Sequence, residues 1–303
     1  MIIKFSNHLL ERWLSIIKVN IKEILFFIVW SSLMYLFEHV MLWNWISIPM
    51  TPVALLGGGL AIFLGFRNNS AYDRWWEARK LWGGIVNVSR TFSANAISFL
   101  PDKINEAIVK RHLAYVYALK IQQREISSYE ESFKFISESE SILYLNKKNT
   151  ATAILAKQSQ VITDLKRTGV IDAFEHKILM ENISSSFDLQ GGLERILKTV
   201  FPFFYKYFTR TFLWLFMIVL PMSLVHEMGW QSIPLSVAIS FVYMVLDKIG
   251  DVTENPLKGR SSGTPISSIC RTIEIDLLQM LESDFIPEPL PIKQTRHKSS
   301  YLD

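Results

Sequence analysis

Hydrophobic residues gather in four long runs without charged side chains, at residues 24–37, 40–66, 211–225 and 228–246. The apolar character of the first run continues past Glu38 and His39 to Trp45. A helix needs about 20 residues to cross about 30 Å of hydrocarbon, so the pattern predicts four transmembrane helices. The first and third runs reach that length only if flanking charges snorkel or face protein. Four buried helices of a soluble protein are the alternative, but such helices normally show a polar stripe, and the fourth run has almost none.

Lysine and arginine flank these runs on one side only. They precede the first run, follow the second and follow the fourth, whereas the links inside each pair of runs hold none. The positive-inside rule assigns the basic side to the cytoplasm. We therefore expect a multi-pass protein with both termini and residues 67–200 in the cytoplasm. Residues 1–23 carry charges throughout and show no cleavable secretory signal, so the first run is expected to remain as an anchor.

The block between the second and third runs is predicted to be helical. Ile171, Phe174 and Ile178 follow the spacing of one helix face, and Gly169 and Gly191-Gly192 are expected to interrupt helices. No alternating strand pattern of useful length occurs, so the fold class is an all-α membrane protein. We divide the chain into residues 1–66 with the first two transmembrane helices, a cytosolic helical region 67–200, residues 201–247 with the last two transmembrane helices, and a cytosolic segment and tail 248–303.

Composition agrees with a membrane protein and argues against other classes. Of 303 residues, 50% are hydrophobic and 20% charged, and the mean hydropathy is +0.21. The single cysteine, Cys270, excludes an intrachain disulfide framework and a cysteine metal cluster. The net charge of +4 is spread along the chain without a basic block of the kind that binds nucleic acid.

The sequence lacks a constellation of catalytic residues. No two of the six histidines have a metal-binding helical spacing, and neither an HExxH nor a P-loop motif occurs. Residues 259–263 fit G-x-S-x-G, but that motif forms a nucleophile elbow only between a strand and a helix. Here it follows Asn255-Pro256 in a predicted loop, so we interpret Ser261 as part of a turn and expect no enzyme.

The second run contains a glycine-rich segment, with glycines at 57, 58, 59 and 65. In a bilayer, small residues let helix backbones approach closely, and tight packing is one interpretation. Another follows from spacing, because Gly58, Ile62 and Phe66 lie at i, i+4 and i+8 and share one face. Several copies of this helix around an axis would stack Ile62 and Phe66 into apolar rings, which can gate ions by dewetting. Beyond Phe66 the same face turns polar, at Asn69, Ser70 and Asp73.

Four segments of the chain resemble the prokaryotic bestrophins. The run GFRNNSAYDRWWEAR at residues 65–79 is the most specific match. The run GGLERI at 191–196, with Thr199 and Pro202, ENPL at 254–257 and CRTIEI at 270–275 follow in the family's order. The resemblance extends over about residues 1–285, and it implies a protein of the bacterial inner (plasma) membrane.

Bestrophins are homopentameric ion channels with one pore along the fivefold axis. The resemblance implies a membrane neck lined by Gly58, Ile62 and Phe66, with Gly58 in place of the usual bulky aliphatic residue, and a vestibule entered past Asn69, Ser70 and Asp73. A second constriction, the aperture, is expected on a helix at residues 171–183, with Ile178 as first choice and Phe174 or Glu175 as alternates. Expected partners are further copies of the chain, membrane lipids and permeant monovalent ions, and no nucleic acid.

Animal bestrophins are opened by calcium, which binds an acidic run just after the family's Asn-Pro-Phe element. Here Asn255 remains of that region, but the following residues, LKGRSSG at 257–263, contain no carboxylate. Calcium needs six to eight oxygen ligands, usually including several carboxylates. We therefore expect no metal, no cofactor and no calcium gating.

The permeant ion has two interpretations. The family implies chloride, whereas some prokaryotic members favour monovalent cations such as sodium. Asp73 near the vestibule mouth would favour cations, and Arg67 and Arg74 would oppose them unless paired. A membrane-anchored structural or regulatory protein without ion flux remains a further hypothesis. A secondary transporter is less favoured, because the chain shows no inverted repeat.

Overall fold

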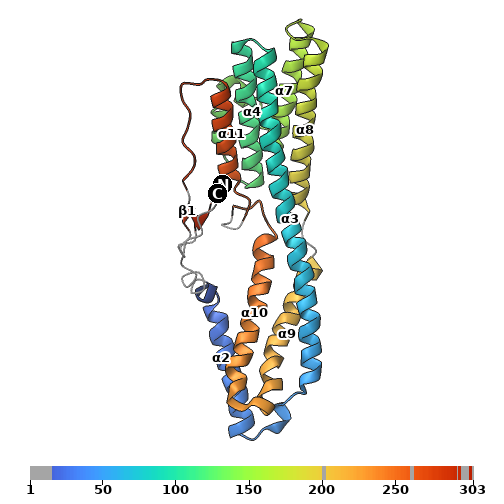
Figure 1. Ribbon diagram of the computed structural model, residues 1–303, viewed down its shortest axis with the longest axis vertical. Helices are drawn as coiled ribbons and strands as arrows, with labels where there is room; N and C mark the ends of the chain where they lie inside the picture. The colour runs from blue at the N-terminus through green and yellow to red at the C-terminus, as the bar shows by residue number, and fades with distance from the viewer. Residues whose placement is uncertain (1–15, 200–202, 260–262, 292, 295–299, 302–303) are drawn as a thin grey trace. The chain divides into compact units, whose positions relative to one another are not determined.

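The computed structural model describes residues 16–199, 203–259, 263–291, 293–294 and 300–301 (Figure 1). The described elements are α2 (Ile21–Tyr35), the π-helix η1 (Leu36–Val40), the 3-10 helix η2 (Asn44–Ile46), α3 (Met50–Phe99), α4 (Asp102–Gln123), α5 (Glu130–Phe133), α6 (Glu138–Ile142), α7 (Thr150–Arg167), α8 (Ala173–Lys198), α9 (Phe203–Met228), the 3-10 helix η3 (Gly229–Gln231), α10 (Ser232–Thr253), α11 (Ile266–Met280), and the two-residue strands β1 (Lys293–Gln294) and β2 (Ser300–Tyr301).

Three segments among the described residues are long and apolar enough to cross a membrane: Ile21–Val40, Met50–Phe99 and Tyr205–Thr253. The third covers α9 from Tyr205 onward and all of α10, which the short helix η3 separates. The four apolar runs of the sequence thus correspond to α2, the first part of α3, α9 and α10. Pro52 and Pro234 lie in the first turns of α3 and α10, where a proline removes no intrahelical hydrogen bond.

The described chain forms two compact units. The first contains α2, α3 up to Asp73, α9 and α10. Its core is apolar and is centred on Phe27, Leu64, Met217 and Leu220. Gly57 matters for this packing, because a Cβ atom there would lie 2.8 Å from the ring of Phe216. Close approach of α3 to α9 therefore requires glycine at this position.

The second unit contains α3 from Arg74 onward, α4 to α8 and α11. The run from Leu113 to Leu119 on α4 is almost completely buried, as expected for a stretch of helix that is apolar on all sides. Neighbouring helices surround α4, since it contacts α7, α8 and α11. Cys270 on α11 is completely buried in the same core.

The start of α8 differs from the prediction. The expected helix at 171–183 begins at Ala173, because Asp172 caps it by accepting hydrogen bonds from the backbone N–H groups of Phe174 and Glu175. Ile171 therefore precedes the helix, although it is buried as the periodicity predicts. Phe174 and Ile178 are exposed, so the predicted common face is not the buried face of α8, which carries Leu179 and Ile183 instead.

Of the two predictions that glycines interrupt helices, one is confirmed and one is wrong. Gly169 ends the turn after α7 with a φ of +76°, a conformation that favours glycine. Gly191 and Gly192, in contrast, lie inside α8 and do not interrupt it. Similarly, α3 continues without a break past residue 66, where the apolar run ends.

Candidate functional site

The first part of α3 has one buried and one exposed face. The buried positions follow helical spacing at Val53, Gly57, Leu60, Leu64, Arg67 and Ala71. The exposed positions Gly58, Ile62, Phe66, Asn69 and Asp73 follow the same spacing. At about 100° per residue, the centres of the two stripes are about 180° apart. We call the second set, together with Ser70, the exposed stripe.

The apolar part of the exposed stripe is open in this chain. Ile62 is 61% and Phe66 65% exposed. A Cβ atom at Gly58 would have no neighbour within 4 Å. Large apolar side chains gathered on one surface indicate a surface that lipid, a partner or an additional copy covers, or a constriction lined by several copies. The structure therefore brings the three predicted neck residues onto one uncovered face.

The polar part of the exposed stripe lies on the same helix without interruption. Asn69, Ser70 and Asp73 are all exposed. Within the described part of the chain, Asp73 forms no ion pair. One continuous helix surface thus passes from glycine through bulky apolar side chains to polar ones.

The predicted aperture residues lie at the start of α8 in the second unit. Phe174 is 77% exposed and Ile178 is also exposed, whereas Glu175 is partly covered. The Glu175 carboxylate accepts a hydrogen bond from the backbone N–H of Asp172 at 2.9 Å. Glu175 therefore has a structural role in the helix cap, while Phe174 and Ile178 remain available to contact other molecules.

Asn255 lies two residues after the end of α10, just before the turn at residues 256–257. Its carbonyl accepts a weak hydrogen bond from the backbone N–H of Lys258 at 3.5 Å, and the Thr264 N–H donates to the carbonyl of Pro256 at 2.8 Å. Among the described residues, no three His, Cys, Asp or Glu side chains are placed to hold a metal ion. Ser261 lies outside the described residues.

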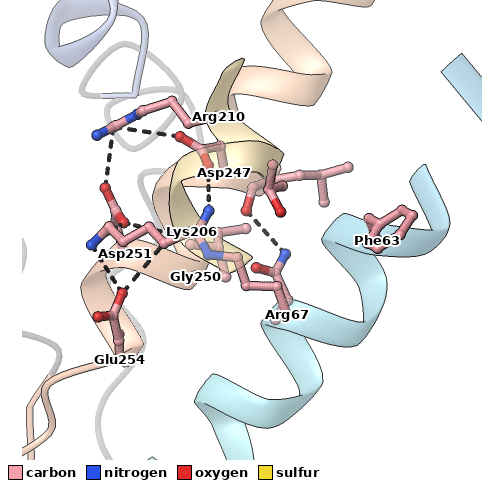
Figure 2. Close-up of polar contacts among 12 residues, drawn as sticks. Phe63, Arg67, Lys206, Arg210, Asp247, Gly250, Asp251 and Glu254 are labelled. Carbon is pink, nitrogen blue, oxygen red and sulfur yellow. Dashed lines mark hydrogen bonds and ion pairs between the residues drawn. The ribbon is translucent and has the colours of Figure 1, made fainter. Parts of the chain in front are cut away.

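Behind the exposed stripe, the first unit contains a network of charged side chains that the sequence analysis did not predict (Figure 2). We call it the ion-pair cluster; it comprises Arg67 from α3, Lys206 and Arg210 from α9, and Asp247, Asp251 and Glu254 from α10 and its end. The three cations and three carboxylates balance in formal charge. A sequence signal does exist, because 247, 251 and 254 have the spacing of one helix face.

Arg67 is at the centre of the ion-pair cluster. Its Nη1 atom donates to Asp247, and its Nη2 atom donates to Asp251 at 2.5 Å. The Arg67 side chain is 2% and the Asp247 side chain 6% exposed. Asn68, the next residue, donates from Nδ2 to the carbonyl of Leu246 at 2.9 Å. Consecutive residues of α3 are thus joined to α10 by polar contacts that are buried or partly buried.

Comparison with known proteins identifies the class of this chain. Residues 5–279 match the family described as Bacterial/Fungal Bestrophin protein. The chain is 30% identical over 247 residues to a voltage-dependent anion channel-forming protein of Mesorhizobium japonicum, covering 81% of this chain and 79% of the relative. It is also 30% identical over 243 residues to the voltage-dependent anion channel-forming protein YneE of Escherichia coli, covering 80% of each chain.

Solved structures agree with this assignment. A crystal structure of a bacterial bestrophin homologue from Klebsiella pneumoniae superimposes with a TM-score of 0.84 at 26% identity, covering 88% of this chain and 99% of that chain. A crystal structure of a point mutant of the Klebsiella pneumoniae homologue gives a TM-score of 0.82 at 27% identity, covering 86% of this chain and 98% of that chain. The chain therefore belongs to the bacterial and fungal bestrophin family, and, apart from the two short strands β1 and β2, it is a helical membrane protein of that fold. The resemblance inferred from the sequence is confirmed.

Proposed function

We propose that this protein is a homopentameric channel for small monovalent ions in the bacterial inner membrane. In this proposal α2, the first part of α3, α9 and α10 cross the membrane, both termini are cytoplasmic, and five copies of the exposed stripe line one pore. Anions are the expected permeant ions, because two relatives carry the name voltage-dependent anion channel-forming protein.

The exposed stripe is the observation that carries the proposal. A face of α3 that touched only lipid would have no reason to continue into Asn69, Ser70 and Asp73. A face buried against a neighbouring helix would favour a small residue at each turn, yet Ile62 and Phe66 are bulky. Stacked apolar rings that open into a polar surface suit a narrow neck followed by a water-filled vestibule. Gly58 makes the first ring position the widest of the three.

A second candidate is a cation-selective channel of the same fold, and the ion pairing of Arg67 favours it. Arg67 is neutralised within the ion-pair cluster, and Arg74 donates to the carbonyl of Ile196. Asp73 is exposed between them in the sequence. Five copies would form a ring of carboxylates at the vestibule entry, an arrangement that attracts cations.

The proposal includes no calcium gating and no cofactor. The segment after Asn255 carries Lys258 where a calcium site of this kind would need carboxylates. A channel without this site should open equally in calcium and in a calcium chelator.

Ion replacement on the purified protein in planar bilayers tests the proposal. With a salt gradient of sodium chloride, the reversal potential should move toward the chloride equilibrium potential for an anion channel and toward that of sodium for the second candidate. Currents that stay the same when calcium is chelated would support calcium-independent opening. Protein that inserts and gives no current in any salt would contradict the channel and favour a structural or regulatory membrane protein.

A further inference from the structure

Phe66 and Arg67 follow one another on α3 but lie in opposite environments. The Phe66 side chain is 65% exposed, whereas Arg67 is 1% exposed. On a helix, neighbouring side chains are turned by about 100° from each other. The direction in which Arg67 is held therefore determines the direction in which Phe66 and, one turn away, Ile62 point.

The contacts of Arg67 are suited to holding one rotation of α3. Two nitrogens of its guanidinium bind two carboxylates one turn apart on α10, Asp247 and Asp251. A planar group that donates in two directions fixes orientation as well as distance. Because Arg67 and Asp247 are both almost completely buried, water does not compete effectively for either partner.

Gly250 provides a second and independent constraint on the same junction. A Cβ atom at Gly250 would lie 2.5 Å from Oδ1 of Asn68 and 3.4 Å from Cζ of Arg67. The bare backbone of α10 at this position therefore accommodates both side chains of α3. Figure 2 shows Gly250 beside Arg67. The packing of α3 against α10 thus depends on shape complementarity as well as on charge.

The carboxylates that bind Arg67 are shared with cations of α9. Lys206 lies 2.9 Å from the Asp251 oxygen that Arg67 also contacts, and Arg210 lies 3.2 Å from the other oxygen of Asp251. Arg210 also approaches Asp247 at 3.5 Å. The three cations interact with the same carboxylates. A displacement of α9 would therefore change the strength of the ion pairs between Arg67 and these carboxylates.

We infer that Arg67 is a positioning residue for the pore: its forked ion pair with Asp247 and Asp251 sets the rotation of α3 that directs Ile62 and Phe66 toward the pore axis. Lys206 and Arg210 adjust the strength of that hold by sharing the carboxylates. The inference rests on the proposed channel function and adds the element that orients its neck.

Thiol accessibility measures the rotation of α3 directly. Ile62→Cys reports the exposed stripe, and Phe63→Cys reports the position about 100° away, which faces an apolar groove beside Tyr205 and Phe212. The native Cys270 is completely buried, and burial raises the pKa of its thiol, so the reporters can be introduced into the otherwise unchanged chain. The readout is the rate at which a charged thiol reagent blocks the current of the reconstituted channel.

With the ion-pair cluster intact, Ile62→Cys should be blocked much faster than Phe63→Cys. Adding Arg67→Gln should lower the ratio of the two rates by about fivefold or more, the smallest effect typical of a coupling between sites. Arg67→Lys keeps the charge but loses the fork, and should give an intermediate ratio. Gly250→Ala keeps every charge of the cluster and should also lower the ratio. Arg90→Gln, which removes an exposed ion pair with Asp276 in the second unit, is the matched control and should leave it unchanged.

A residue that only stabilised the fold would lower the yield or thermal stability and leave the ratio of block rates unaltered. An unaltered ratio in Arg67→Gln would therefore overturn the inference, and if that variant does not assemble, unaltered ratios in Arg67→Lys and Gly250→Ala would do so. A different failure is distinguishable: if Ile62→Cys is not blocked even with the cluster intact, the pore proposal itself is wrong and the inference falls with it.

Discussion

Leu81 on α3 packs directly over Gly192 on α8, so closely that a Cβ atom at Gly192 would lie 2.9 Å from Cδ2 of Leu81. The reverse arrangement occurs one step along the interface, where a Cβ atom at Gly84 on α3 would lie 2.6 Å from Leu189 on α8. Each helix thus presents a leucine to a glycine of the other. This reciprocal packing explains why α8 tolerates glycine in its interior.

The adjacent glycines of α8 should respond oppositely to alanine. Gly191 has no atom within 4 Å of an added Cβ, so Gly191→Ala should gain helix propensity, up to about 1 kcal/mol. Gly192→Ala gains the same propensity but overpacks Leu81, at a cost of about 1–3 kcal/mol. Thermal unfolding of the purified variants should place Gly191→Ala above and Gly192→Ala below the parent. Equal shifts for both variants would contradict the packing.

His112 should make the second unit acid-sensitive. It is completely buried on α4, with Nε2 2.9 Å from the hydroxyl of Ser89, and burial lowers its pKa to about 3. Between pH 6.5 and about 3 the unfolded chain binds a proton at this residue that the folded chain does not, so the free energy of unfolding falls as the pH is lowered. At pH 4.5 the loss amounts to about 3 kcal/mol.

Melting curves of the parent and His112→Gln between pH 7 and pH 4.5 test this expectation. Glutamine does not titrate, so the parent should lose more stability than the variant as the pH falls. His176, which is only partly buried, provides the control: His176→Gln should follow the parent. Parallel pH profiles for the parent and His112→Gln would show that His112 does not carry the effect.

Shortening Ile62 should enlarge the pore. Ile62→Ala removes apolar surface from the proposed neck, and lowering a dewetting barrier by only about 0.5–1 kcal/mol raises the current about two- to fivefold. Single-channel recording gives this quantity directly. Val29→Ala, on an exposed apolar position of α2, is the matched control. Unchanged unitary current in Ile62→Ala would remove Ile62 from the conduction path.

Neutralising Asp73 should shift ion selectivity toward anions. Asp73 is exposed on the stripe, and a carboxylate within a few ångströms of a permeant ion contributes about 1 kcal/mol even in water, which is about a fivefold change in a permeability ratio. Reversal potentials of Asp73→Asn in a sodium chloride gradient measure the shift. Glu106→Gln, which changes an exposed carboxylate of α4 that pairs with Lys110, should leave the potential as it is. An effect of equal size in both variants would assign it to general surface charge.

Much of this architecture could be predicted from local patterns in the sequence. The four apolar runs predicted the positions of α2, α3, α9 and α10, and the spacing of Gly58, Ile62 and Phe66 predicted that they share a face, because both properties depend on residues near one another in the chain. The end of the apolar run at Phe66, in contrast, did not predict where α3 ends. The hydropathy of a segment indicates whether lipid or water surrounds it. It does not indicate where a helix ends, because a helix continues as long as its backbone hydrogen bonds can form.

Contacts between distant residues were the part that could not be predicted. Arg67 was identified as a charge without an assigned partner, and its partners Asp247 and Asp251 lie 180 and 184 residues away. The local sequence pattern does not indicate which of several acidic residues contacts Arg67. The same limit applies to Gly192. Helix propensity predicts an interruption of the helix there, but glycine is needed at this position because Leu81 packs against it from another helix.

A cysteine scan along the first part of α3 tests the central claim most directly. Single cysteines at residues 58, 60, 62, 64 and 66 of the reconstituted channel are exposed to a charged thiol reagent while the current is recorded. Substitutions at 58, 62 and 66 should make the current sensitive to the reagent, and those at the buried positions 60 and 64 should not. Block at 60 and 64, or no block at any of the three positions of the exposed stripe, would contradict a pore lined by this face of α3.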